Sequence, residues 1–207
     1  MTEPLPQIVN KGSKLEEVVQ MALQIGTGAI DVVLISTSEI SVEDDLANFC
    51  REPRCSYYGV SANCPPYVSG PAGFRDMAKI CKNALAIRIT VPMESLLSYE
   101  QRDIMKLLHE IVSDIEKMSI KLGYSHSKAF AVGSCKEIFC HNQVDCRLLV
   151  KGGGSCRYQR YARPPIEAFG INVNQLAKIA GWTVNTDKNA DTNKISMGAV
   201  YGLVLIG

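Results

Sequence analysis

The stretch "AIDVVLIS", residues 29–36, is β-branched and almost wholly apolar. A run of this kind is typical of a strand that is covered on both faces. Similar runs are "NALAIRITV" at 83–91, the short "KAFAVG" at 128–133 and the closing "ISMGAVYGLVLI" at 195–206. Helical patterns separate these runs, so the sequence predicts an α/β fold, with α+β as the alternative, in which a single sheet of about four strands packs against helices.

Two capping boxes, Ser13 with Glu16 and Ser98 with Gln101, mark the starts of a first helix and of the longest helix. The apolar residues of the longest helix recur on one face, which indicates packing against the sheet. Helices are expected at residues 14–25, 74–82, 99–122, 164–170 and 172–181.

The composition predicts a single domain that spans residues 1–207. A formal net charge of +1 and a pI near 7.5 provide no argument for a nucleic acid or a membrane surface as partner. No secretory signal is recognisable, and no segment approaches 18 uninterrupted apolar residues. A cytoplasmic location is therefore expected, where thiols stay reduced.

Seven of the eight cysteines fall into two cysteine-rich loops, at residues 50–66 and 133–165. The first group has the spacing C-x4-C-x8-C and the second C-x4-C-x5-C-x9-C. Because functional residues commonly lie in loops held by a rigid scaffold, we expect the two groups to converge in space. The candidate metal ligands are Cys50, Cys55, Cys64, Cys135, Cys140, Cys146 and Cys156.

These spacings favour an iron–sulfur cluster over a single metal ion. Neither group contains the repeated C-x2-C pair of a zinc ribbon, and wide spacings let the chain wrap a larger cofactor. A proline follows Cys64, as it follows a cluster cysteine in bacterial ferredoxins. A [4Fe–4S] cluster is the favoured cofactor, in one or two copies, with structural zinc as the alternative. Disulfides would fit only an exported protein.

The second loop is locally basic, with six cations against two acids between Cys135 and Arg163. Nearby cations and backbone N–H donors would stabilise an anionic cluster, and three consecutive glycines could supply such donors as a nest. The other interpretation is a flexible connector beside a solvated face. The candidate cofactor-binding residues are Gly152, Gly153, Gly154, Arg157, Arg160 and Arg163.

Two other side chains are weighed as ligands. Cys81 lies at a helix end among apolar residues, where a small buried residue is at home, so a structural role is expected. His141 is the histidine next to Cys140, and a surface position on a polar loop is expected for it. Tyr57 and Tyr58 could shield a cluster from water or belong to the ordinary core.

The patterns C-x4-C-x-Y-Y-G-x4-C-P-P, G-S-C and R-P-x-x-E-A-x-G-I-x-V resemble a family of uncharacterised, cysteine-rich metal-binding proteins found largely in anaerobic bacteria and archaea. The resemblance extends from about Leu15 to the C-terminus. It implies metal binding through the seven cysteines, expected to be iron–sulfur, and it implies no particular reaction. It also suggests that Arg163 and Glu167 form an ion pair or a helix cap that orders the second loop.

Three functions remain open at this point. The first is electron transfer to a partner enzyme, which needs no substrate pocket. The second is an enzyme, or a sulfur or metal carrier, in which the three-cysteine group holds a cluster with an open iron beside a pocket for a small anionic substrate, lined by Tyr57, Tyr58, Arg157 and Arg160. The third is a structural zinc protein. A cluster near the surface would also favour a partner interface or a homodimer.

Overall fold

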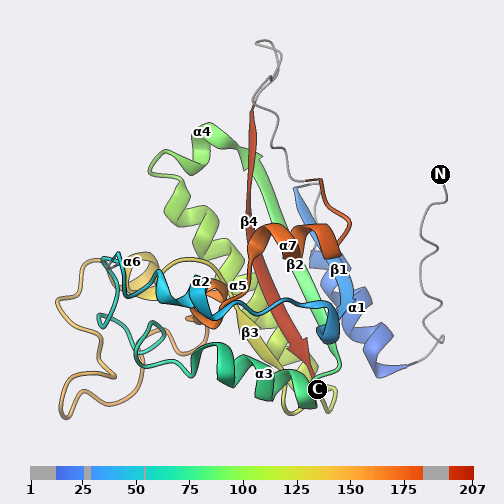
Figure 1. Ribbon diagram of the computed structural model, residues 1–207, viewed down its shortest axis with the longest axis horizontal. Coiled ribbons are helices and arrows are strands. Elements are labelled where there is room, and N and C mark those ends of the chain that lie inside the picture. Colours follow the sequence, from blue (N-terminus) through green and yellow to red (C-terminus); the bar gives the residue numbers. More distant parts are fainter. Residues whose placement is uncertain (1–12, 26–28, 54, 184–195) are drawn as a thin grey trace.

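The computed structural model describes residues 13–25, 29–53, 55–183 and 196–207. One antiparallel sheet runs through the molecule in the order β1-β2-β4-β3 (Figure 1). The predicted α/β class and the sheet of about four strands are confirmed. The strands are β1 (Ile30–Ser36), β2 (Asn83–Pro92), β3 (Lys128–Phe130) and β4 (Met197–Ile206).

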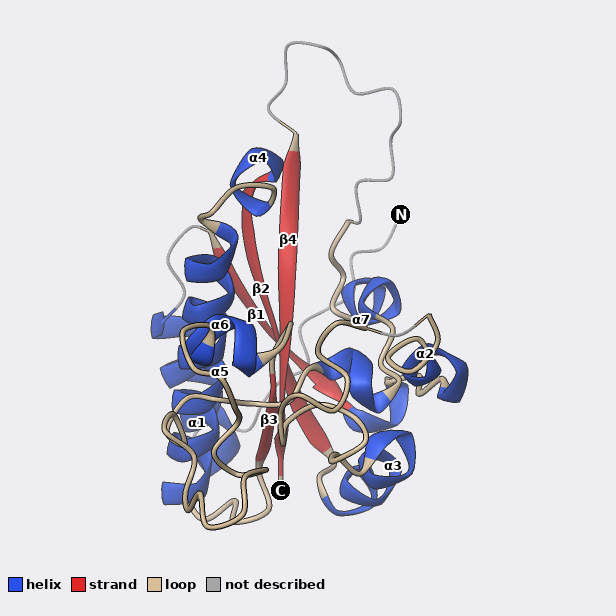
Figure 2. Cartoon of the chain, turned by 90° about the vertical axis from the view of Figure 1, so that its left-hand side faces the viewer, coloured by secondary structure: helices blue, strands red, loops and turns tan. Residues whose placement is uncertain are grey.

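Strand β1 lies at one edge of the sheet, and both of its faces are covered as predicted. Val33 and Ile35 pack into the core on one side, while Val32 and Leu34 pack into the core on the other. Alternation of this kind follows from the two-residue period of a strand. The sheet therefore has helices on both sides, which Figure 2 shows with the strands nearly edge-on.

Helices α1 (Lys14–Ile25) and α5 (Gln101–Lys121) cover one face of the sheet. The Glu16 amide donates to Ser13 Oγ at 3.2 Å, as the first capping box predicts. The apolar face of α5 buries Leu108, Ile111, Val112 and Ile115 against β2, β3 and β4. Within the described residues, no helix is both long and apolar enough to cross a membrane.

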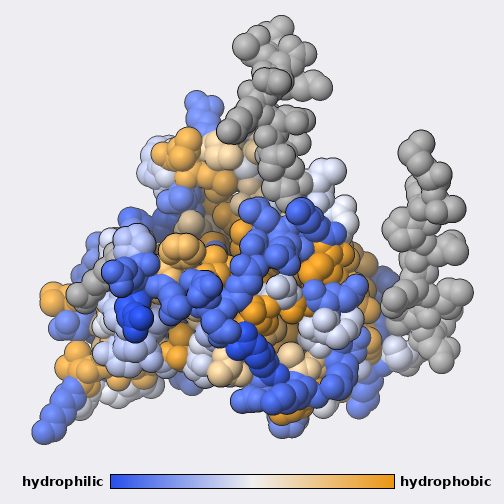
Figure 3. Space-filling model, viewed as in Figure 1, coloured by the Kyte–Doolittle hydropathy of each residue, from blue (hydrophilic) through white to orange (hydrophobic). Residues whose placement is uncertain are grey.

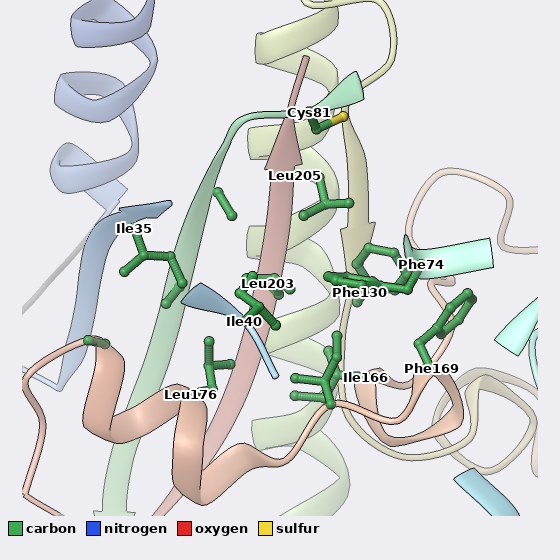
Figure 4. Close-up of a cluster of buried hydrophobic side chains, with 14 of the residues drawn as sticks. Ile35, Ile40, Phe74, Cys81, Phe130, Ile166, Phe169, Leu176, Leu203 and Leu205 are labelled. Atoms are coloured by element: carbon green, nitrogen blue, oxygen red, sulfur yellow. The ribbon is translucent and has the colours of Figure 1, made fainter. Parts of the chain in front are cut away.

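Short elements cover the opposite face of the sheet. Phe130 of β3 packs between Phe74 and Phe169, with ring centroids 5.6 and 4.8 Å apart (Figure 4). Cys81 lies in the same core with 1% of its surface exposed, in agreement with a structural role. The elements of this layer are α2 (Asp44–Asn48), α3 (Gly70–Ile80), the 3-10 helix η2 (Ile166–Phe169) and α7 (Val173–Ile179). The remaining elements are η1 (Thr37–Glu39), α4 (Met93–Leu96) and α6 (Cys135–Cys140).

Two polar side chains of α5 fasten both ends of the second cysteine loop. Glu116 accepts the Ala129 amide, ahead of the loop, at 2.7 Å and the Nε of Arg163, at its far end, at 2.7 Å. His109 lies 3.1 Å from the Val132 carbonyl through Nε2 and accepts the Arg163 amide at Nδ1. The buried network therefore closes the loop at its base.

The His109 ring is fully buried and should make stability depend on pH. Its pKa is lowered from 6.5 to about 4, chiefly by burial and in smaller part by the charge of Arg163, against backbone hydrogen bonds that raise it. As pH falls below 6.5 the unfolded chain takes up the proton first, so stability present above pH 6.5 is lost progressively down to about pH 4. We expect a loss of about 3 kcal/mol over this window, measured by urea unfolding of the metal-free protein.

The change His109→Gln should flatten this pH dependence, because glutamine does not titrate. The matched control is His126→Gln, which removes an exposed histidine that follows the same helix. It should leave the slope as it is. A slope that survives in His109→Gln would show that other groups are responsible.

Candidate metal centres

The two cysteine-rich loops lie side by side at one end of the sheet (Figure 1). Ser61 Oγ of the first loop is 3.0 Å from Cys135 Sγ of the second, and Cys64 Sγ is 3.4 Å from Ser134 Oγ. The Tyr57 hydroxyl donates to Glu137 at 2.8 Å. The predicted convergence of the two groups is confirmed.

The second group encloses a small cavity of about 20 Å³ that all four of its cysteines line. Cys135 begins helix α6 and Cys140 ends it, so the prediction of a loop is wrong for residues 135–140. The Ser134 side chain caps this helix by accepting the Lys136 amide, and Ile138 and Phe139 bury its inner face. These tertiary contacts stabilise a helix that its six residues would not form alone.

The first group borders a separate and larger cavity of about 470 Å³. Cys50 follows α2 in a turn, Cys55 is exposed and Cys64 is buried. Tyr57 and Tyr58 line this cavity, as expected for a pocket beside the three-cysteine group. Arg157, expected there as well, lines the small cavity of the second group instead. Arg160 lies beside Asp114 at 3.9 Å with 67% of its side chain exposed.

Without a bound cation, the thiols favour their neutral form. The pKa of Cys135 is raised to about 11, chiefly by burial and in smaller part by the charges of Cys64 and Cys156, against hydrogen bonds from Ser61 and Asn63. Burial also raises the pKa of Cys50, with added repulsion from Cys55, Cys64 and Glu167. Thiolates this close together need a compensating positive charge, and a metal would supply it while releasing protons.

The second cavity already holds positive charge. Lys136, Arg147 and Arg157 line it, and the Lys136 ammonium donates to the Cys140 carbonyl at 2.9 Å. Arg157 and Lys136 both act to lower the pKa of Cys140, although burial and Cys156 raise it overall. The donor set of four thiols beside cations therefore fits an anionic cluster.

The glycines of the second loop shape its turn. A Cβ on Gly153 would lie 2.0 Å from the Arg147 carbonyl oxygen, so the close approach of these segments requires glycine. Gly152 and Gly153 line a shallow groove with Arg147 and Arg157. Among the hydrogen bonds of the described residues, the one from a backbone amide to a cysteine sulfur runs from Tyr158 to Cys156 at 3.4 Å. A donor role for Gly152, Gly153 and Gly154 stays a prediction.

Arg163 has a structural partner other than the expected one. Its guanidinium pairs with Glu116 of α5, and both side chains are only 9% exposed. The suggested ion pair of Arg163 with Glu167 is therefore wrong, because the arginine turns toward α5. Glu167 instead lines the cavity of the first group, and burial raises the pKa of its carboxyl.

Sequence reasoning did not identify the polar neighbours of the sulfurs. Ser61 and Asn63 of the first loop contact Cys135 of the second at 3.0 and 3.5 Å, respectively. The signal was the short hydroxyl and amide side chains just before Cys64, which are also common in ordinary turns. Hydrogen bonds of this kind tune metal-bound thiolates.

In the described part of the chain, no three histidine, cysteine, aspartate or glutamate side chains are close enough together to hold one metal ion. The family model described as "Predicted metal-binding protein (DUF2284)" matches residues 33–206. No curated protein matches the chain, and no solved structure matches it.

Proposed function

Because the chain belongs to this family of predicted metal-binding proteins, we propose that its two cysteine groups hold [4Fe–4S] clusters and that it transfers electrons to a partner protein. The observation that carries the proposal is the division of seven thiols between two adjacent cavities. Four thiols would complete one cluster, as in bacterial ferredoxins. When bound, such clusters supply one-electron chemistry.

The arrangement favours clusters over zinc. Structural zinc needs four ligands about 2.3 Å from one ion, and no such ion-sized set occurs among the described residues. The local charge agrees, since Lys136, Arg147 and Arg157 would balance the negative charge of a four-thiolate cluster.

The surface of the second loop suits a docking partner. Val144 is 92% exposed, and Leu148 and Val150 are 48% and 46% exposed. Arg147 and Arg157 border the same groove as Val144 and Val150, and Figure 3 shows hydrophobic and hydrophilic patches side by side at this end of the molecule. A redox partner with an acidic rim around apolar residues would complement this surface.

Anaerobic purification followed by iron, acid-labile sulfide and zinc analysis tests the proposal. We expect about eight irons and eight sulfides per chain, because each of two clusters contains four of each, and an EPR signal from the reduced protein. About four irons would indicate one cluster. Stoichiometric zinc without sulfide would refute cluster binding.

A second candidate function follows from the cavity of about 470 Å³ beside the first group. Three thiols leave one iron of a cubane without a cysteine, and this iron could bind a substrate as a Lewis acid or carry sulfur. The apolar wall formed by Met105, Val132 and Ile138 could accommodate a small molecule. Ligand-induced changes in the EPR spectrum would distinguish this function from electron transfer alone.

A further inference from the structure

Two acidic side chains, Glu137 and Glu167, line the cavity of the first group together with its three cysteines. Glu137 is already engaged, since it accepts the Tyr57 hydroxyl at 2.8 Å and pairs with Arg102 at 3.0 Å. These partners lower the pKa of its carboxyl. Glu137 therefore has no need of a further cation.

Glu167 is in a different position. Within the described residues its carboxylate forms no ion pair, and the hydrogen bond it receives comes from its own backbone amide. It lines the same cavity as Cys50, Cys55 and Cys64, and its charge contributes to the raised pKa of Cys50. A partly buried carboxylate without a cationic partner is costly to keep charged, and a bound cation would stabilise its charged form.

The backbone around Glu167 is firmly held. The residue belongs to η2, where its neighbours Ile166 and Ala168 are 0% and 1% exposed. The Ile166 amide donates to the Ala131 carbonyl at 3.0 Å, which fixes the start of the element against the chain leaving β3. Glu167 therefore borders this cavity, and the neighbouring one that Arg88 lines, from a rigid segment, as a preorganised ligand requires.

No cationic side chain of the described residues lines this cavity, in contrast to the three that line the second cavity. A metal bound in this cavity would supply the compensating positive charge. We propose that the carboxylate of Glu167 is the fourth protein ligand of the metal centre held by Cys50, Cys55 and Cys64. This inference rests on the proposed function only in requiring that the first group binds metal.

A carboxylate oxygen ligand would make one iron of this centre different from the irons bound by cysteine. Carboxylates suit harder metal ions than thiolates do, so the iron bound by Glu167 should exchange its ligand more readily than the iron bound by a cysteine. Without a substrate, Glu167 would complete the ligand set of the first centre, and a substrate could displace it. The second centre would keep its four thiolates.

Three variants of the anaerobically purified protein test the assignment, with iron release to a chelator and the EPR spectrum of the reduced protein as readouts. Glu167→Gln should release iron from the first centre at least about tenfold faster, since even outer-shell changes cost 10–100-fold in metal affinity. Glu167→Cys should retain the iron and alter the EPR spectrum. The matched control, Glu94→Gln, neutralises an exposed acid of α4 that lines neither cavity and should leave iron release unchanged.

Iron release and EPR spectra of Glu167→Gln that equal those of the wild type would overturn the inference. If Glu167→Gln does not fold, Glu167→Cys decides, because a ligand role requires it to keep iron with a changed spectrum. A wild-type protein that carries zinc and no sulfide would refute the proposed clusters alone. Zinc release from the same variants would then decide whether Glu167 is a ligand.

Discussion

Replacing Glu116 by alanine should lower the free energy of unfolding by about 3–5 kcal/mol, the cost of leaving one partner of a buried ion pair without the other. The change removes the acceptor of the Ala129 amide and leaves the Arg163 guanidinium buried without its carboxylate. Because these bonds hold both ends of the second cysteine loop, metal content at the second group should fall as well. Urea unfolding and metal analysis measure the two effects.

The control for Glu116 lies on the same helix. Asp114 pairs with Lys117 at 3.3 Å, but its side chain is 44% exposed. Surface pairs of this kind contribute about 0–1 kcal/mol, so Asp114→Ala should change stability little. The double variant Glu116→Leu/Arg163→Met should recover much of the loss, because it replaces both buried charges by apolar groups. Equal losses of stability in Glu116→Ala and Asp114→Ala would contradict the role of Glu116 in holding both ends of the loop.

The regular elements with strong local signals could be predicted from the sequence. The capping box of Ser13 and the one-sided apolar pattern of α5 are local properties, and both helices form. The capping box predicted at Ser98 is wrong, because α5 begins at Gln101 with Glu100 as its N-cap and no side-chain cap bond. Helix α6 was missed because its six residues depend on contacts with α5 that no local pattern reveals. The strand order β1-β2-β4-β3 was likewise underivable, since β4 pairs with β2 across more than a hundred residues of chain.

The cysteines of the candidate site could be predicted from the sequence, but most of the residues around them could not. Cysteine spacing indicates metal binding whatever the fold, and the structure assigns the two groups to two cavities. The arginines were harder to assign, because charge alone does not tell a cation beside sulfur, as Arg157 is, from one in a buried pair, as Arg163 is. Glu167 carried no signal as a ligand, since a single glutamate after two prolines is typical of a helix start.

The contacts between the two loops bear on electron transfer. Ser61 and Asn63 belong to the first loop but contact the sulfur of Cys135 in the second. Metal bound at one group would therefore alter the hydrogen bonding around the other. Two metal centres joined by these contacts would form a path for electrons, from the cavity of the first group to the exposed surface of the second loop.

Replacing Cys64 and Cys146 separately by alanine should each remove only part of the iron, about half of it if each group holds one four-iron cluster. The reason is that the two cysteines line different cavities. Cys64 lines the large cavity and Cys146 the small one. Alanine is preferred to serine because a serine oxygen could still bind iron. Iron and sulfide analysis of the anaerobically purified variants gives the result, and EPR of the reduced proteins shows which signal is lost.

The control for both variants is Cys81→Ala, which removes a cysteine from the core and from neither cavity. It should lower stability through the small cavity that it creates and should keep all of the iron. If either Cys64→Ala or Cys146→Ala lost all iron and sulfide while remaining folded, the seven thiols would serve one shared centre. The hydrogen bonds that join Ser61 and Asn63 to Cys135 would then lie within a single site and not between two.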